Sequence, residues 1–206
     1  ATHLLHAALK QVLGDHVNQA GSYVGPDRLR FDFSHFSPVT EEELRRVEEI
    51  VNDQILAAKD VTIEELPIDE AKNRGAVALF GEKYGSIVRV VTVPGFSMEF
   101  CGGVHVGNTA QIGMFKILSE SSTGAGVRRI EAVTGHGALN YVREMEDMVK
   151  TAATGLKCRS NDICARICAL QSDYKAAEQK ISELEGQIAK AQVSDDVIIW
   201  IAHNNK

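Results

Sequence analysis

The sequence lacks several features that would assign it to a broad class of protein. No apolar run reaches the roughly 18 residues that suggest a membrane-spanning helix, and no signal-peptide pattern is present. The four cysteines do not form the framework of a disulfide-rich secreted protein. We therefore expect a soluble, cytoplasmic protein that does not act on membranes.

The sequence also lacks an excess of positive charge. Its net charge of −6 argues against a general nucleic-acid-binding protein, because nonspecific affinity comes mainly from cations that neutralise phosphates. A local basic patch remains compatible with RNA binding, and Arg128, Arg129 and Lys116 are the candidates for it. With 206 residues, of which 44% are hydrophobic, the chain is long enough to bury a core of ordinary size.

Hydrophobic periodicity predicts a mixture of helices and strands before about residue 137. Apolar residues at helical spacing predict a helix over 2–13, and Thr40 with Glu43 forms the capping-box pattern of a second helix over 41–58. The other expected elements are a hairpin over 16–33, strands at 61–66, 87–93, 97–101, 113–119 and 127–133, and a short helix at 69–74. Strands with hairpin-like connections and a few helices indicate an α+β domain built on an antiparallel sheet.

Beyond this domain the pattern changes to a heptad repeat. Apolar residues alternate in steps of four and three at Ile163, Ile167, Leu170, Tyr174, Ala177, Ile181, Leu184 and Ile188. This seam predicts a helical hairpin or coiled coil over 138–192, with a turn around 155–162. The apolar run 197–201 predicts a strand at the start of a further segment, 193–206. The expected organisation is therefore a domain over 1–137, a helical stalk and the beginning of a third part.

The most informative motif is Cys101-Gly102-Gly103-Val104-His105. Thiolate and imidazole are ligands that zinc prefers, and the two glycines allow a turn tight enough for both side chains to reach one ion. Spacing alone is weak evidence, since a buried thiol near a surface histidine has the same pattern. His3 and His6 share a face of the first predicted helix and offer further imidazoles.

Five segments occur along the chain in a characteristic order: ATHLLHAAL, RLRFDFSHF, ALFGEKYG, FCGGVHV and GVRRIEAVTG. In this order and spacing they resemble the editing domain of bacterial-type alanyl-tRNA synthetases. The resemblance is dense over residues 1–142, and the remainder resembles the helical stalk that follows this domain. It implies a zinc site formed by HxxxH on a helix and CxxxH on a loop, with His3, Cys101 and His105 as ligands.

The chain departs from the family's pattern at two points. The family's helix usually reads His-Thr-Ala-Thr-His, of which only the second histidine, His3, is present here. We therefore expect the chain to be a fragment of a longer polypeptide, with His6 packed beside the site or replacing the absent histidine. Val104 stands where the family has threonine, which removes a hydroxyl group beside the site.

The resemblance also implies residues that contact the substrate. Gln19 occupies a position where the family has glutamine or threonine lining the editing pocket, and its amide can both donate and accept hydrogen bonds. The segment from Gly124 to Arg128, which includes Gly126, resembles the loop that approaches the tRNA end, where arginine meets phosphate; Arg129 follows it. The alternatives are a solvent-facing strand residue for Gln19 and an ordinary glycine turn for the loop.

Other chemically reactive residues carry no predicted function. Cys158, Cys164 and Cys168 are expected to be free thiols rather than a second metal site. His16, His35 and His136 have no partner at a useful spacing, and we expect them to be structural or surface residues.

The function implied by the resemblance is hydrolysis of the ester that joins serine or glycine to the 3′ end of tRNA(Ala). An alanine-binding pocket cannot exclude the smaller glycine and rejects one extra hydroxyl poorly, so a second site that selects the error is needed. The metal has three candidate roles: activating water, polarising the ester carbonyl or positioning the substrate. The sequence does not decide among them.

Two other functional classes remain open at this stage. One is a non-catalytic tRNA-binding or interaction module, and the other is a free-standing trans-editing deacylase. The implied partners are the acceptor end of tRNA(Ala), the rest of a synthetase chain, and a second copy through the helical segment. No residue stands out as a nucleophile with an adjacent base, which disfavours a covalent serine mechanism.

Overall fold

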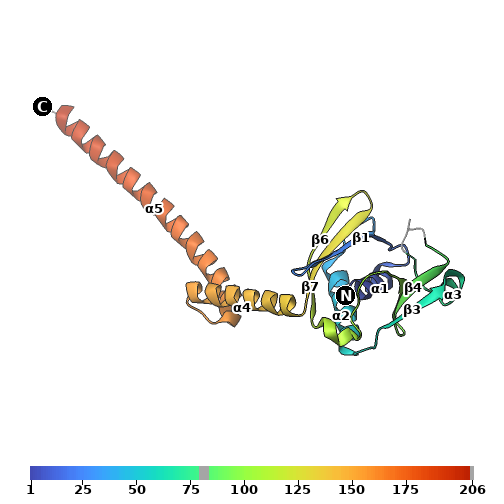
Figure 1. Ribbon diagram of the computed structural model, residues 1–206. Coiled ribbons are helices and arrows are strands. Elements are labelled where there is room, and N and C mark those ends of the chain that lie inside the picture. Colours follow the sequence, from blue (N-terminus) through green and yellow to red (C-terminus); the bar gives the residue numbers. More distant parts are fainter. Residues whose placement is uncertain (79–83, 205–206) are drawn as a thin grey trace. The chain divides into compact units, whose positions relative to one another are not determined.

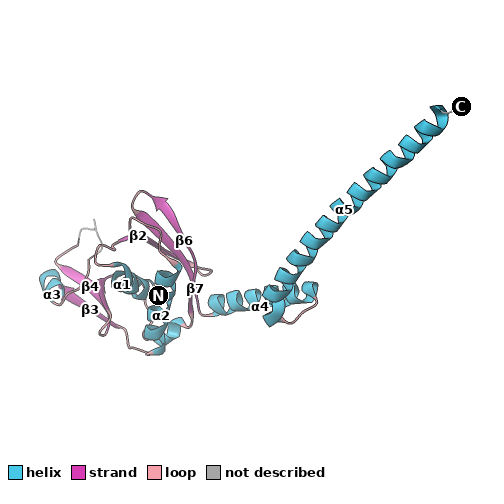
Figure 2. Ribbon diagram, turned by 180° about the vertical axis from the view of Figure 1, so that it is seen from behind, coloured by secondary structure: helices cyan, strands magenta, loops and turns pink. Residues whose placement is uncertain are grey.

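The computed structural model describes the backbone of residues 1–78 and 84–204, and the side chains of residues 1–78 and 84–191. It has the predicted α+β architecture, with antiparallel sheets and packed helices followed by a long helix (Figures 1 and 2). The chain divides into two compact units, residues 1–143 and 144–206, and each is described by itself. Most of the ALFGEKYG segment falls outside the described residues.

The first unit contains a four-stranded antiparallel sheet made of two hairpins. Its strands are β1 (Gln19–Val24), β2 (Leu29–Ser34), β6 (Phe115–Gly124) and β7 (Val127–Thr134), in the order β1-β2-β7-β6. β2 pairs with β7 so that Phe31 lies opposite Ile130 and Asp32 lies opposite Arg129. This pairing joins two hairpins that are far apart in the sequence into one sheet.

Helices α1 (Thr2–Leu13) and α2 (Glu41–Leu56) build the main hydrophobic core with this sheet. Leu5 and Leu9 of α1 are fully buried, as is Phe31 of β2. Burial of each such side chain contributes on the order of 1.5–3 kcal/mol. The core therefore fixes which face of α1 is available to other parts of the chain.

The start of α2 is closed by reciprocal hydrogen bonds between Thr40 and Glu43. The Glu43 N–H donates to Thr40 Oγ1 at 3.2 Å, and the Thr40 N–H donates to Glu43 Oε2 at 2.8 Å. Both bonds satisfy backbone donors that a helix N-terminus would otherwise leave unpaired. The predicted capping box is confirmed.

A smaller antiparallel sheet forms beside α1. Its strands are β3 (Thr62–Pro67), β4 (Ile87–Val93) and β5 (Ser97–Phe100), in the order β3-β4-β5, with α3 (Ile68–Asn73) packed against β3 and β4. A short 3-10 helix, η1 (Thr109–Ile112), follows β5. Because α1 contacts both α2 and β5, it links the main core to this second sheet.

The second part of the chain is helical. The helix α4 (His136–Leu156) is followed by a 3-10 turn, η2 (Ser160–Asp162), and by α5 (Ile163–Asn204). The two predicted helices and the turn between them are confirmed. The predicted strand at 197–201 is wrong, because these residues continue α5. A helix satisfies its backbone groups within the segment, whereas an isolated strand needs a partner, so β-branched residues do not by themselves specify a strand.

The heptad seam of α5 is exposed. The fractional exposure of its large side chains is 42% for Ile167, 39% for Leu170, 65% for Tyr174, 56% for Ile181, 44% for Leu184 and 57% for Ile188. Within the described residues, the seam therefore has no partner that covers it. No helix in the described part of the chain is long and apolar enough to cross a bilayer.

The capping box predicts a measurable loss of stability on substitution. We expect Thr40→Ala to lower the free energy of unfolding by about 1 kcal/mol, because the Glu43 N–H loses its acceptor and the Glu43 carboxylate loses the bond from the Thr40 hydroxyl. Urea unfolding should show a lower midpoint at an unchanged slope. Thr123→Ala, at an exposed position in β6, is the matched control and should leave the midpoint unchanged. Equal midpoints for both variants would contradict a stabilising cap.

Candidate metal centre

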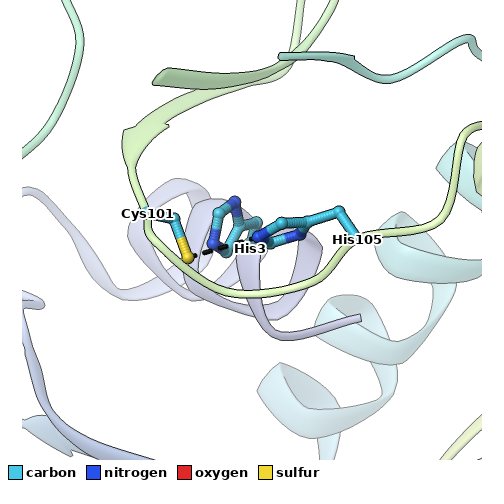
Figure 3. Close-up of side chains that lie close together, drawn as sticks. All are labelled: His3, Cys101 and His105. Carbon is cyan, nitrogen blue, oxygen red and sulfur yellow. Dashed lines mark hydrogen bonds between the residues drawn. The ribbon is translucent and has the colours of Figure 1, made fainter. Parts of the chain in front are cut away.

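Three predicted ligands, His3, Cys101 and His105, lie together at one end of α1 (Figure 3). One donor atom from each lies within 4.8 Å of the others. The His105 Nε2 and Cys101 Sγ atoms are 3.2 Å apart, and the ring centroids of His3 and His105 are 4.7 Å apart. The structure thus brings together two segments from opposite ends of the domain sequence.

The loop that carries Cys101 and His105 is held by Arg89 of β4. The Cys101 N–H donates to the Arg89 carbonyl at 3.0 Å, which continues the pairing of β4 with β5. The Arg89 guanidinium then donates to the carbonyl oxygens of Cys101, at 2.5 Å, and Gly103, at 2.8 Å. Sequence analysis missed Arg89, because its role depends on strand pairing across the turn at 94–96.

The glycines of the motif keep space open beside the donors. A Cβ atom at Gly103 would lie 3.5 Å from Cys101 Sγ and 3.7 Å from His105 Nε2, so a side chain there would pack directly over both. A Cβ atom at Gly102 would meet nothing within 4 Å. The close approach at Gly103 is therefore the position in this turn where a small residue matters most.

A buried carboxylate lies close to the histidines of α1. Glu99 of β5 is 4% exposed, and its Oε2 lies 3.8 Å from His3 Nε2. Its Oε1 lies 3.2 Å from Nδ1 of His6, which is also buried. The His3 Nδ1 atom is buried without a hydrogen-bond partner among the described residues, and so is Nε2 of His6. Sequence analysis did not identify Glu99.

The environment favours neutral imidazoles and an ionised carboxylate. Burial lowers the pKa of His3, although Glu99 opposes this shift. Burial also lowers the pKa of His105 from its ordinary 6.5 to about 4, with further contributions from His3 and Arg89. Burial opposes ionisation of Glu99, but the hydrogen bond from His6 and the charges of His3 and His6 outweigh it, so its pKa lies below the ordinary value. Neutral imidazoles have the free lone pair that a metal ion needs.

The donor set fits a zinc ion. Zinc binds thiolate and imidazole at about 2.0–2.3 Å, so any two such donors on one ion lie within about 4.4 Å of each other. The three donors here lie within 4.8 Å of one another, with Cys101 Sγ and His105 Nε2 3.2 Å apart, so side-chain rotation would bring all three onto one ion. The unpartnered His3 Nδ1 supplies a buried lone pair. These residues form the one potential metal-binding group of three or more side chains within the described residues.

A cleft of about 290 Å³ adjoins the two segments that carry the donors. Its lining includes Ala1, Val104, Val106 and residues of the β1–β2 turn, and none of the three donors. Val104, which separates the glycines from His105, is fully exposed at 102%. Val104 therefore places an exposed apolar side chain in the cleft wall and lies outside the core.

Gln19, the residue expected to line the editing pocket, begins β1 and is half-buried. Its Nε2 donates to Ser22 Oγ at 3.1 Å. It makes no hydrogen bond to the three clustered side chains in the described residues. The structure therefore does not join Gln19 directly to the cluster.

The predicted basic patch is already paired with carboxylates. Arg128 forms a two-point ion pair with Glu120, with Nη2 to Oε2 at 2.6 Å. Arg129 forms a similar pair with Asp32 at 2.6 and 2.7 Å, and Lys116 contacts Glu48 at 2.9 Å. A phosphate group would have to replace these carboxylates.

The predicted glycine loop is the turn between β6 and β7. Gly124 ends β6, and Gly126 adopts a positive φ of 71°, a backbone conformation that favours glycine. The Gly126 carbonyl accepts from the His35 N–H at 3.0 Å, and a Cβ atom at Gly126 would lie 3.5 Å from the Phe36 ring. Phe36 itself is 90% exposed. The turn therefore carries an exposed aromatic side chain next to it.

His16 and His35, expected to be structural or surface residues without a recognisable partner, lie against each other. His16 Nε2 and His35 Nδ1 are 2.8 Å apart in an exposed pair with stacked rings, and His35 Nε2 lies 3.2 Å from Ser37 Oγ. Sequence spacing did not identify the pair, because the antiparallel pairing of β1 with β2 brings residues before β1 close to residues after β2.

Residues 88–131, which include β4, β5 and the Cys101–His105 loop, match the family described as threonyl and alanyl tRNA synthetase second additional domain. The chain is 57% identical over 195 residues to an alanine–tRNA ligase of Listeria monocytogenes, covering 95% of this chain and 22% of the relative. It is 56% identical over 191 residues to that of Lysinibacillus sphaericus, covering 93% and 21%. It is also 55% identical over 196 residues to an alanine–tRNA ligase of Staphylococcus epidermidis, covering 95% of this chain and 22% of the relative. The chain spans about a fifth of the length of these curated relatives.

The clustered donors predict a specific metal stoichiometry. We expect the metal-stripped chain to bind about one equivalent of zinc, and Cys101→Ala to weaken binding strongly, because the only thiolate of the cluster is lost. Titration against a chromophoric chelator measures the affinity. Cys164→Ala removes an exposed thiol and is the control that should bind as the unchanged chain does. Equal zinc affinity in Cys101→Ala would contradict this site.

Proposed function

We propose, because this chain belongs to the alanyl-tRNA synthetase family, that residues 1–137 form an aminoacyl-tRNA editing domain that hydrolyses mischarged tRNA(Ala). The reaction is cleavage of the ester between serine or glycine and the 3′-terminal ribose. The observation that carries the proposal is the convergence of His3, Cys101 and His105 beside a cleft of about 290 Å³. This arrangement supplies a metal-binding group next to a space for a small aminoacyl ester.

The resemblance implies four protein ligands, of which the described residues supply His3, Cys101 and His105. The upstream histidine of the HxxxH pattern would complete a tetrahedral site, whereas three ligands would leave a coordination position for water or substrate. Each of the three donors is only partly buried. When bound, zinc would supply Lewis acidity toward the ester carbonyl or a water of lowered pKa. The chain's own residues hold this site and shape the cleft.

Such a site would act by hydrolysing tRNA that carries the wrong amino acid in preference to correctly charged tRNA. A binding pocket discriminates one missing methyl group or one extra hydroxyl only by about 1–3 kcal/mol. Hydrolysis at a separate site that accepts the serine hydroxyl multiplies this discrimination. We assign Gln19 as the candidate contact to that hydroxyl, because its amide both donates and accepts. In this role the Gln19 side chain exchanges its Ser22 contact for the substrate.

The partner is the acceptor end of tRNA(Ala), together with the remainder of the synthetase chain. The turn at Gly124–Gly126 offers accessible backbone for contact with the nucleic acid, and Arg128 and Arg129 adjoin it. Both arginines now hold carboxylates, so their first role is to fix the β6–β7 hairpin. These ion pairs also disfavour a simple RNA-binding module, because such a module depends on free cations.

We propose that the exposed seam of α5 associates with the same helix of a second copy. The a positions carry Ile167, Tyr174, Ile181 and Ile188, three of them β-branched, and the d positions include Leu170 and Leu184. β-branched residues at a with leucine at d favour a parallel two-stranded coiled coil. Residues 138–192 then act as an association stalk.

Editing predicts selective deacylation. We expect the chain, extended upstream by the first histidine of the HxxxH pattern, to hydrolyse seryl-tRNA(Ala) much faster than alanyl-tRNA(Ala), and Cys101→Ala in that protein to abolish this activity. Gln19→Leu should lose roughly 1–3 kcal/mol of discrimination, because the polar contact to the hydroxyl is removed. Both charged tRNAs must be compared at one salt concentration, since phosphate contacts are salt-dependent. Equal rates on the two substrates would reject serine selection, and full activity of Cys101→Ala would reject a metal-centred reaction.

The association proposal predicts a concentration-dependent dimer. Sedimentation equilibrium should detect a dimer of the unchanged chain, and Leu184→Lys should shift it toward monomer, because a charge at a d position loses its apolar contacts. Glu183→Lys places the same new side chain on an exposed position of the same helix and is the control. A monomer at all concentrations would overturn the proposal and leave the seam to another segment or protein.

A further inference from the structure

Among the residues whose side chains the structure describes, Glu99 is the acidic residue that lies against a histidine of the metal-type cluster, His3. It is 4% exposed and lies on β5, two residues before Cys101. Both of its oxygen atoms face histidines of α1, and these histidines are one helical turn apart. A buried carboxylate is costly unless it has hydrogen-bond partners, so its position requires an explanation.

The two oxygen atoms have different surroundings. Oε1 accepts hydrogen bonds from His6 Nδ1 at 3.2 Å and from Ser97 Oγ at 3.1 Å. Oε2 accepts none of these bonds and lies 3.8 Å from His3 Nε2, where the interaction is electrostatic. His6 and Ser97 thus fix the carboxylate, and its second oxygen remains directed at the clustered histidine.

This arrangement favours one position for the proton of a neutral His3. An anionic oxygen 3.8 Å from Nε2 favours a proton on that nitrogen, which leaves the lone pair on Nδ1. The His3 Nδ1 atom is buried and has no hydrogen-bond partner among the described residues, so a metal ion bound there would satisfy it.

We propose that Glu99 is a positioning residue that orients the His3 imidazole toward a metal ion, and that His6 and Ser97 hold Glu99 in place. The inference rests on the proposed function, since it concerns the same metal centre. It gives buried His6 a defined role, which is to support the carboxylate from α1 without ligating the ion. Supporting carboxylates of this kind typically change metal affinity by roughly 10- to 100-fold.

The test is metal binding by the whole chain, measured with zinc and with cobalt. Glu99→Gln keeps the shape of the side chain and removes its charge, and it should weaken zinc binding by roughly 10- to 100-fold. Glu65→Gln makes the same change at an exposed glutamate of the same sheet and should have no effect. In the cobalt complex of Glu99→Gln, the thiolate charge-transfer band should persist while the ligand-field bands shift, because Cys101 still binds and His3 is misplaced.

The outcomes separate this inference from the proposed function. If the unchanged chain binds no zinc through Cys101, the metal centre of the proposed function fails. If the unchanged chain binds zinc and folded Glu99→Gln binds it equally well with an unchanged cobalt spectrum, the role of Glu99 alone is overturned. Should Glu99→Gln fail to fold by circular dichroism, Ser97→Ala decides the question. That variant should weaken zinc binding about two- to tenfold through loss of one hydrogen bond, and unchanged affinity would overturn the inference.

Discussion

The packing of α1 between the main core and β5 is the constraint on which the site depends. The helix buries Leu5 and Leu9 in the core, and this leaves only one orientation about its axis. His3 and His6, three residues apart, then face β5 together. Because Glu99 and Cys101 follow one another along this strand and its continuation, docking the helix brings the imidazoles to a carboxylate and a thiolate in one step. The core thus positions the chemistry without contributing a polar atom to it.

Local patterns in the sequence predicted local structure well, and predictions failed where strand pairing decides. The Thr40–Glu43 cap and the turn between α4 and α5 follow from residues adjacent in the chain. The set of clustered donors came from resemblance, since C-x3-H spacing alone is compatible with many folds. Arg89 and Glu99 had no local signal, because their roles arise from the pairing of β4 with β5 and from its contact with α1. The strand predicted over 197–201 failed for a related reason, since β-propensity has little meaning without a neighbouring strand.

Several charged side chains of the four-stranded sheet form ion pairs with each other across neighbouring strands. Asp32 and Arg129 are opposite each other on β2 and β7, and the hydrogen bond from Arg129 holds the pKa of Asp32 below its ordinary value. Arg128 and Glu120 join β7 to β6 in the same way. Any phosphate that binds these arginines must first displace a carboxylate held at two points. This cost weakens nonspecific binding, which has no other contacts, more than it weakens binding of a ligand that makes additional contacts. A chain of net charge −6 therefore restricts nucleic-acid contact to a substrate positioned by other groups.

The metal centre and the stability of the first helical turn are coupled. His3 Nδ1 is buried without a hydrogen-bond partner in the described residues, and an unsatisfied buried polar group costs on the order of 1–3 kcal/mol. An ion that accepts this lone pair removes the cost, and it also links α1 covalently to the loop after β5 through Cys101 and His105. Because an ion bound to the folded chain would stabilise it according to its concentration and affinity, metal binding at this site would contribute to the free energy of folding of α1. Residues that orient His3 would then affect both the affinity for the ion and the stability of α1. The same few contacts would therefore govern metal binding and the packing of α1 against β5.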